Sequence, residues 1–121
     1  DYNDDDTCWG LAMTAAAECL VVLCTCPDRD TALRLADAAV TGRLAACVNL
    51  LPGVESVYEW NGALERAHEV QLLAKTTRAA YGALETLWRE LHPYELPELL
   101  AVPVETGSEA YLQWIERAVS A

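Results

Sequence analysis

The dipeptide Asn61-Gly62 is the feature that most restricts the fold of this chain. It separates two runs of alternating hydrophobicity, residues 54–60 (VESVYEW) and 68–76 (HEVQLLAKT). A type I′ turn needs positive φ at both central residues, and Asn-Gly adopts that conformation readily. The sequence therefore predicts an antiparallel hairpin that turns at these two residues. The apolar run at 44–51 precedes the hairpin, and the Pro-Gly pair after it allows a bend within the first strand.

Two further strands follow from hydrophobic runs with stop signals. Residues 20–26 form an apolar, β-branched run that Pro27 ends. Residues 98–104 predict a fourth strand, in which Pro103 is typical of an edge or of a strand end.

Three segments repeat apolar residues at helical spacing. Their apolar positions are Ala32, Leu35, Ala36, Ala39 and Val40; Tyr81, Leu84, Leu87, Trp88 and Leu91; and Tyr111, Trp114, Ile115 and Ala118. The expected caps are Asp28 or Asp30, Gly42, Thr77, and a capping box of Thr106 with Glu109. The element order is then β-α-β-β-α-β with an additional C-terminal helix. This order predicts an α+β, ferredoxin-like sandwich, with two helices on one face of an antiparallel sheet.

The length and the charge restrict the class of protein. A chain of 121 residues supports one domain. The net charge is −11, and basic residues are scattered without a patch, so nucleic acid is not an expected partner. No apolar run approaches the roughly 20 residues that span a bilayer, which argues against a membrane segment.

Residues 1–12 (DYNDDDTCWGLA) carry an acidic run and no hydrophobic period. Met13, the only methionine, follows them directly, so they are either a native acidic leader or an artificial remnant before the natural start. We expect the single folded domain to comprise residues 13–121. Five cysteines and no secretion signal indicate a cytoplasmic protein with reduced thiols.

Cys24 and Cys26 stand one residue apart at the end of the first strand. On a strand they share one face, about 6.6 Å apart by the strand rise, which is too far for a disulfide without distortion. Two interpretations remain open: small core hydrophobes, or thiols that share a soft metal. His92, in LHPYELPE, is either a helix C-cap or a ligand, whereas His68 is expected to be a solvated strand residue.

Ser56, Tyr58 and Trp60 alternate onto one face of the first hairpin strand. A single small domain would leave these aromatic rings exposed or under a helix, so a subunit interface is a reasonable hypothesis.

The chain resembles the CutA family of divalent-cation tolerance proteins over about residues 19–119. The segments that carry the resemblance are VLCTCPD, LAACVNLLPGVESVYEWNG, EVQLLAKTT and HPYELPELLAVPVETGSEAYLQWI. The resemblance implies a ferredoxin-like protomer in a tight homotrimer, with a role in copper and divalent-metal tolerance and no catalytic activity. It implies copper or another divalent cation as ligand and no organic cofactor.

The resemblance also implies ligands. Copper ligation in bacterial relatives is associated with the cysteine that aligns with Cys24 and with a His-His pair before Pro-Tyr. His92 is the second member of that pair, but Leu91 replaces the first, and Cys26 could supply a replacement thiolate. The alternative function is a small-molecule sensor resembling PII-type signal proteins, with ligands in clefts between subunits. The cleft would be lined by His92 together with Ser56, Tyr58, Trp60, Glu69, Lys75 and Tyr94.

Overall fold

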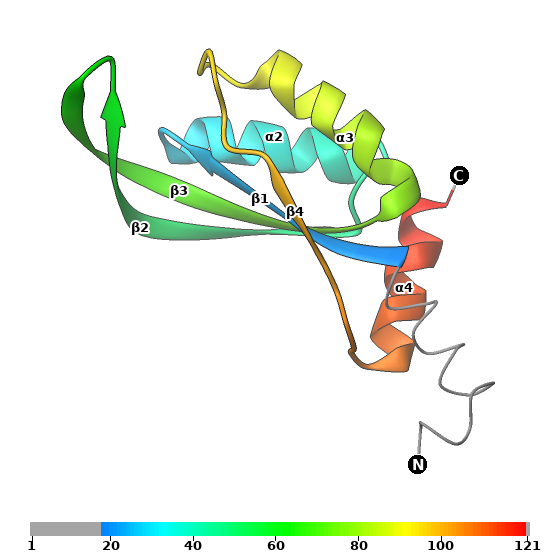
Figure 1. Ribbon diagram of the computed structural model, residues 1–121. Coiled ribbons are helices and arrows are strands. Elements are labelled where there is room, and N and C mark those ends of the chain that lie inside the picture. The colour runs from blue at the N-terminus through cyan, green and yellow to red at the C-terminus, as the bar shows by residue number, and fades with distance from the viewer. Residues whose placement is uncertain (1–17, 121) are drawn as a thin grey trace.

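The computed structural model describes residues 18–120 and shows one antiparallel sheet with helices (Figure 1). The residues of the leader, Met13 and Cys8 lie outside the described part. The elements are β1 (Cys19–Cys26), α2 (Arg29–Thr41), β2 (Cys47–Trp60), β3 (Ala63–Thr77), α3 (Arg78–Leu91), β4 (Leu100–Pro103) and α4 (Glu109–Val119). This order confirms the predicted β-α-β-β-α-β arrangement with a C-terminal helix.

The four strands pair in the order β2-β3-β1-β4, and every pairing is antiparallel. Helices α2 and α3 lie together on one face of the sheet, whereas α4 lies at the end where β1 begins (Figure 1). The fold is therefore the predicted α+β ferredoxin-like sandwich. Strand β1 lies inside the sheet, between β3 and β4. His92, at the end of α3, contacts Thr25 near the end of this strand.

The hairpin of β2 and β3 extends well beyond the helical body (Figure 1). Its turn has φ of 54° at Asn61 and 83° at Gly62, and Trp60 pairs with Ala63 across it. These values confirm the I′-type turn. The register shifts between Leu51 and Val54, which makes the expected bend a bulge within one continuous strand.

Helix caps follow the sequence at the N-termini of two of the three helices that it predicts. The Asp28 carboxylate accepts the Thr31 N–H at 2.8 Å, and the Thr77 hydroxyl accepts the Ala80 N–H at 3.3 Å. The predicted capping box of Thr106 with Glu109 is wrong. Helix α4 begins at Glu109, and the hydroxyl of Ser108, the residue directly before it, accepts the Tyr111 N–H. An N-cap side chain reaches the N–H groups two or three residues on, and Thr106 lies too early for that role.

The main core lies between the sheet and the helix pair. Trp88 on α3 is completely buried, and its indole N–H donates to the Leu35 carbonyl of α2 at 2.9 Å. That hydrogen bond satisfies the only polar atom of the indole ring, and it joins the two helices above β1. The other buried apolar residues of this core include Val22, Cys24, Cys26, Leu72, Ala74 and Leu84.

Helix α4 forms a second, smaller cluster with the start of β1. Leu112 and Ile115 are buried against Cys19. Tyr111 and Trp114 belong to the predicted apolar face of this helix, but in the protomer both rings are exposed and lie against each other with centroids 5.4 Å apart. The position of α4 at the sheet end, which periodicity does not specify, decides which of its faces is covered.

The fourth strand is shorter than the predicted residues 98–104. Strand β4 comprises only residues 100–103, which pair with residues 20–23 of β1. The Glu98 carboxylate instead accepts a hydrogen bond from the Gln71 amide at 3.1 Å. Pro103 lies at the end of an edge strand, as predicted. Among residues 18–120, no helix is long and apolar enough to cross a membrane.

Candidate metal centre

Two thiols converge at the end of β1. Cys24 and Cys26 are separated by one residue, so strand alternation places both on the same face of β1. That face is the one covered by the helices, and both side chains are completely buried. Both are free thiols, as the sequence analysis expected.

His92 reaches the same place from the end of α3. Its backbone N–H donates to the Trp88 carbonyl, which makes it the C-cap residue of the helix. Its ring Nε2 lies 2.7 Å from the Thr25 carbonyl, and its Nδ1 accepts the Tyr94 N–H at 3.1 Å. A carbonyl can only accept, so we assign the proton to Nε2 and a neutral ring. The backbone of His92 therefore caps the helix, as one of the two alternatives predicted, while its ring turns inward.

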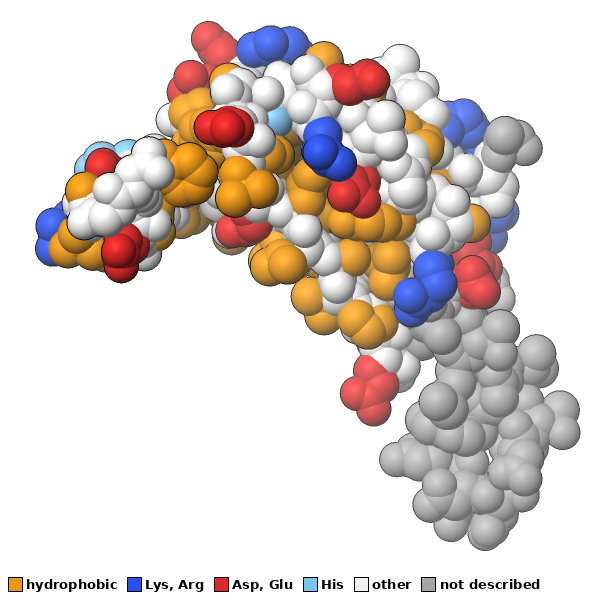
Figure 2. Space-filling model, turned by 45° about the horizontal axis from the view of Figure 1, so that its top comes forward, with side chains coloured by type: hydrophobic (Ala, Val, Ile, Leu, Met, Phe, Trp, Pro, Cys, Tyr) orange, Lys and Arg blue, Asp and Glu red, His pale blue; other side chains and the backbone are white. Residues whose placement is uncertain are grey.

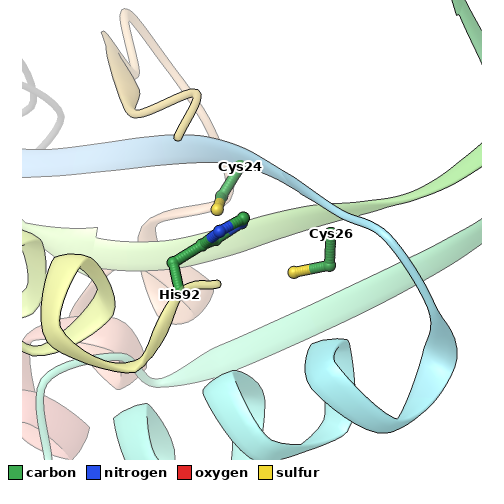
Figure 3. Close-up of side chains that lie close together, drawn as sticks. All are labelled: Cys24, Cys26 and His92. Carbon is green, nitrogen blue, oxygen red and sulfur yellow. The ribbon is translucent and has the colours of Figure 1, made fainter. Parts of the chain in front are cut away.

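The thiols and the imidazole form one cluster, in which the ligand atoms of Cys24, Cys26 and His92 lie within 4.8 Å of one another (Figure 3). The centre of a triangle with such sides is at most about 2.8 Å from each corner, and metal bonds to sulfur and nitrogen are about 2.0–2.3 Å. A movement of roughly half an ångström per side chain would close the difference. The site therefore has the size for a small cation.

Cys26 is the member that the sequence analysis named only as a replacement thiolate. The strand rise separates the two Cα atoms by about 6.6 Å, but the side chains lean toward each other, so that separation overestimates the distance between the thiols. The alternation of side chains along CTC already indicated that Cys26 lies on the same face of the strand as Cys24. At the neighbouring position, Leu91 is half-buried and packs against the core, so it offers no donor.

The two thiols of the cluster differ in pKa. The hydrogen bond between the two thiols, together with burial, raises the pKa of Cys24 far above the usual range. The same hydrogen bond lowers the pKa of Cys26, against the opposing effect of burial. Cys26 is therefore the first of the pair to become a thiolate, the form that binds metals.

A cavity of about 930 Å³ lies beside the cluster, between the hairpin and the segment after α3. Thr25, whose carbonyl accepts the His92 N–H, is part of its wall. Its lining includes Ser56, Tyr58, Trp60, Glu69 and Tyr94. The structure thus gathers five of the seven predicted cleft residues in one protomer, and His92 and Lys75 are not part of the lining.

Lys75 lies elsewhere in the protomer. It is on β3 opposite Cys47 and donates to the Asn49 side chain. Within this protomer it does not line the cavity.

The cavity is acidic and partly aromatic. Among residues 18–120, its lining includes three glutamates (Glu69, Glu95 and Glu98) and no lysine or arginine. Glu69 is buried and accepts a hydrogen bond from the Tyr94 hydroxyl at 2.8 Å. Burial and this hydrogen bond raise the pKa of Tyr94. A cation that approaches the thiol cluster through this cavity would meet favourable charge.

Comparison with known proteins identifies the family. The model of the CutA1 divalent ion tolerance protein family matches residues 20–118. The chain belongs to the CutA1 family. The divalent-cation tolerance protein CutA of Pectobacterium atrosepticum is 46% identical over 102 residues, which are 84% of this chain and 93% of that protein.

Solved CutA structures share the fold. The crystal structure of CutA from Xylella fastidiosa superposes with a TM-score of 0.84 at 42% identity, over 85% of this chain and 99% of that one. The periplasmic divalent cation tolerance protein CutA from Archaeoglobus fulgidus gives a TM-score of 0.82 at 30% identity, over 84% of this chain and 99% of that one. The CutA1 fold is therefore established for this chain, and a role connected with divalent cations is the family's named property.

Proposed function

We propose that this CutA1 protein binds copper, or another cation of similar softness, at the buried cluster of Cys24, Cys26 and His92, without catalysing a reaction. The observation that carries the proposal is the convergence of two thiols and one imidazole from two distant chain segments onto one point. Thiolate sulfur and imidazole nitrogen are the donors preferred by copper and zinc, whereas magnesium and calcium prefer oxygen. The family name, divalent ion tolerance, agrees with such a role.

Mass spectrometry of the intact assembly tests this proposal. The protein is measured as purified and after addition of Cu(II) or Zn(II), together with a Cys24→Ser variant and a Cys47→Ser control. Cys47 lies on β2, outside the cluster. We expect one metal per chain in the wild type and in the control, and a loss of metal in Cys24→Ser. Equal metal content in all three proteins would contradict the proposed site.

We propose further that the protein is a homotrimer. Along the hairpin and β4, side chains that one protomer leaves at least 40% exposed include Val57, Tyr58, Trp60, Leu64, Leu100 and Val102. Figure 2 shows hydrophobic side chains distributed over much of the face it presents. The edge strand β4 also leaves one row of backbone groups available for pairing. Sedimentation at micromolar concentration should give three times the mass of the chain, and a monomer would contradict the proposal.

The second candidate function is a PII-like sensor of a small molecule. The observation that favours it is the cavity beside the cluster, whose volume is in the range of ligand pockets. In a trimer this cavity would lie in a cleft between subunits, and Lys75 would have to enter it from a neighbouring protomer. Soaked crystals that show an organic molecule in the cavity, with the thiol cluster empty after metal treatment, would favour the sensor function over the metal function.

We propose the cytoplasm as the compartment. The four cysteines among the described residues are free, and a reducing compartment keeps thiols available for metals. The Archaeoglobus fulgidus relative is a periplasmic protein by its name, so the compartment is a separate question from the fold. Fractionation of cells that express the protein would answer it, and recovery with periplasmic markers would contradict the proposal.

A further inference from the structure

We propose that Cys26 makes the cluster a two-sulfur site that selects monovalent copper, Cu(I), over divalent ions. This inference rests on the proposed function, because it assumes that the cluster binds a metal. It goes further in naming the oxidation state of the ion and the residue that determines the selection.

The number and type of donors are the first argument. Within residues 18–120 the cluster comprises two sulfurs and one imidazole, all three side chains buried. Zn(II) in protein sites is almost always four-coordinate, and its open catalytic sites take the fourth donor from water. Cu(I) is a soft ion that is stable with two or three donors, and thiolates select it. A dry site with three donors, two of them sulfur, therefore meets the needs of Cu(I) more completely than those of a divalent ion.

The hydrogen bonds of His92 are the second argument. Both ring nitrogens are engaged, one with the Thr25 carbonyl and the other with the Tyr94 N–H. A metal bond to either nitrogen must replace one of these hydrogen bonds. The thiols have weaker attachments, such as the 3.9 Å contact from the Cys24 sulfur to the Thr25 carbonyl. The two sulfurs are thus the readily available donors, and only Cu(I) is satisfied by two of them.

The burial of the sulfurs is the third argument. Both Cys24 and Cys26 have no exposed surface, because α2 and α3 cover this face of β1. Burial excludes the water molecules that would complete the coordination of a divalent ion. The acidic cavity shares Thr25 with the cluster and gives a cation a favourable approach to it.

The test is an anaerobic competition titration on the full chain. Cu(I) is supplied as its complex with the chromophoric chelator bicinchoninate, and Zn(II) affinity is measured in parallel with a zinc-responsive dye. The variants are Cys26→Ser and, as matched control, Cys47→Ser. We expect Cys26→Ser to weaken Cu(I) binding by about 100-fold or more. Loss of a residue that only hydrogen-bonds to a metal ligand costs up to about 100-fold in affinity, and loss of the ligand itself should cost at least as much. We expect the wild type to bind Zn(II) more weakly than Cu(I), because this site offers Zn(II) only three of its four usual donors. The ratio of Cu(I) affinity to Zn(II) affinity should fall by about 10-fold or more in Cys26→Ser.

X-ray absorption of the Cu(I)-loaded wild type gives a result that does not depend on the folding of a variant. Two sulfur neighbours at about 2.3 Å would support the inference. A single sulfur neighbour, or an unchanged Cu(I) affinity in Cys26→Ser, would overturn it while leaving the metal-binding function intact. Failure of the wild type to bind Cu(I), Cu(II) or Zn(II) would instead overturn the proposed function itself.

Discussion

The hydrogen bond between Tyr94 and Glu69 holds the wall of the cavity beside the metal centre, and Tyr94→Phe is the perturbation that tests it. The substitution removes one oxygen and leaves the buried Glu69 carboxylate without the donor that lies 2.8 Å from it. Hydrogen bonds to charged groups contribute about 1.5–3 kcal/mol. Since Tyr94 is only half-buried, we expect a loss near the lower end, about 1.5–2 kcal/mol of unfolding free energy at pH 7.

Urea unfolding followed by circular dichroism measures this loss, at one fixed protein concentration for all variants. Tyr58→Phe is the matched control, because the Tyr58 side chain is exposed, and it should change the free energy by less than about 0.5 kcal/mol. Glu69→Gln and the double variant complete a mutant cycle. A coupling energy close to zero between positions 69 and 94 would refute the reasoning.

The pH dependence of the same variant follows from the raised pKa of Tyr94. In the unfolded chain this hydroxyl ionises near its ordinary pKa of 10, whereas the folded protein retains the proton to higher pH. The stability that the group contributes is therefore complete below pH 10 and is lost as the pH rises further. The difference in unfolding free energy between wild type and Tyr94→Phe should shrink above pH 10, and a difference that grows there would contradict the assignment.

Three further predictions concern the scaffold and the thiols. Asp28→Ala removes the N-cap of α2 and should lower the unfolding free energy, measured by urea unfolding with Asp28→Asn as a control that keeps the cap. Gly62→Ala should lower the melting temperature, because the residue has φ of 83°, which strains an L-amino acid. The added Cβ would meet no atom within 4 Å, so backbone strain is the only cause expected, and an unchanged melting temperature would refute it. Alkylation of the partly unfolded protein should not discriminate between Cys24 and Cys26, whereas the folded protein should react first at Cys26, whose pKa is lowered. Peptide mapping that finds Cys24 modified first would contradict the order of the two pKa values.

The sequence predicts most of this fold because its local signals agree with one another. Asn61-Gly62, Asp28 and Thr77 each specify a turn or a cap through their own backbone chemistry, and the structure uses all three. The errors fall where tertiary placement decides. Ser108 rather than Thr106 caps α4, because the helix begins at Glu109 and Thr106 lies too early to reach its first N–H groups.

The candidate site was only partly predictable. Cys24 and His92 could be named from the family resemblance, but their contact depends on how α3 lies over β1, which spacing does not determine. Cys26 shares a face with Cys24 by simple alternation, yet the distance between the sulfurs depends on side-chain direction. The two hydrogen bonds that occupy the His92 ring follow from the turn after α3 and have no signal in the sequence.

The most direct test of the metal centre is a crystal structure of the copper-loaded protein with anomalous diffraction measured at the copper edge. The account predicts one anomalous peak per protomer, bonded to the sulfurs of Cys24 and Cys26 and close to the ring of His92. A peak at any other place, with this cluster empty, would contradict it.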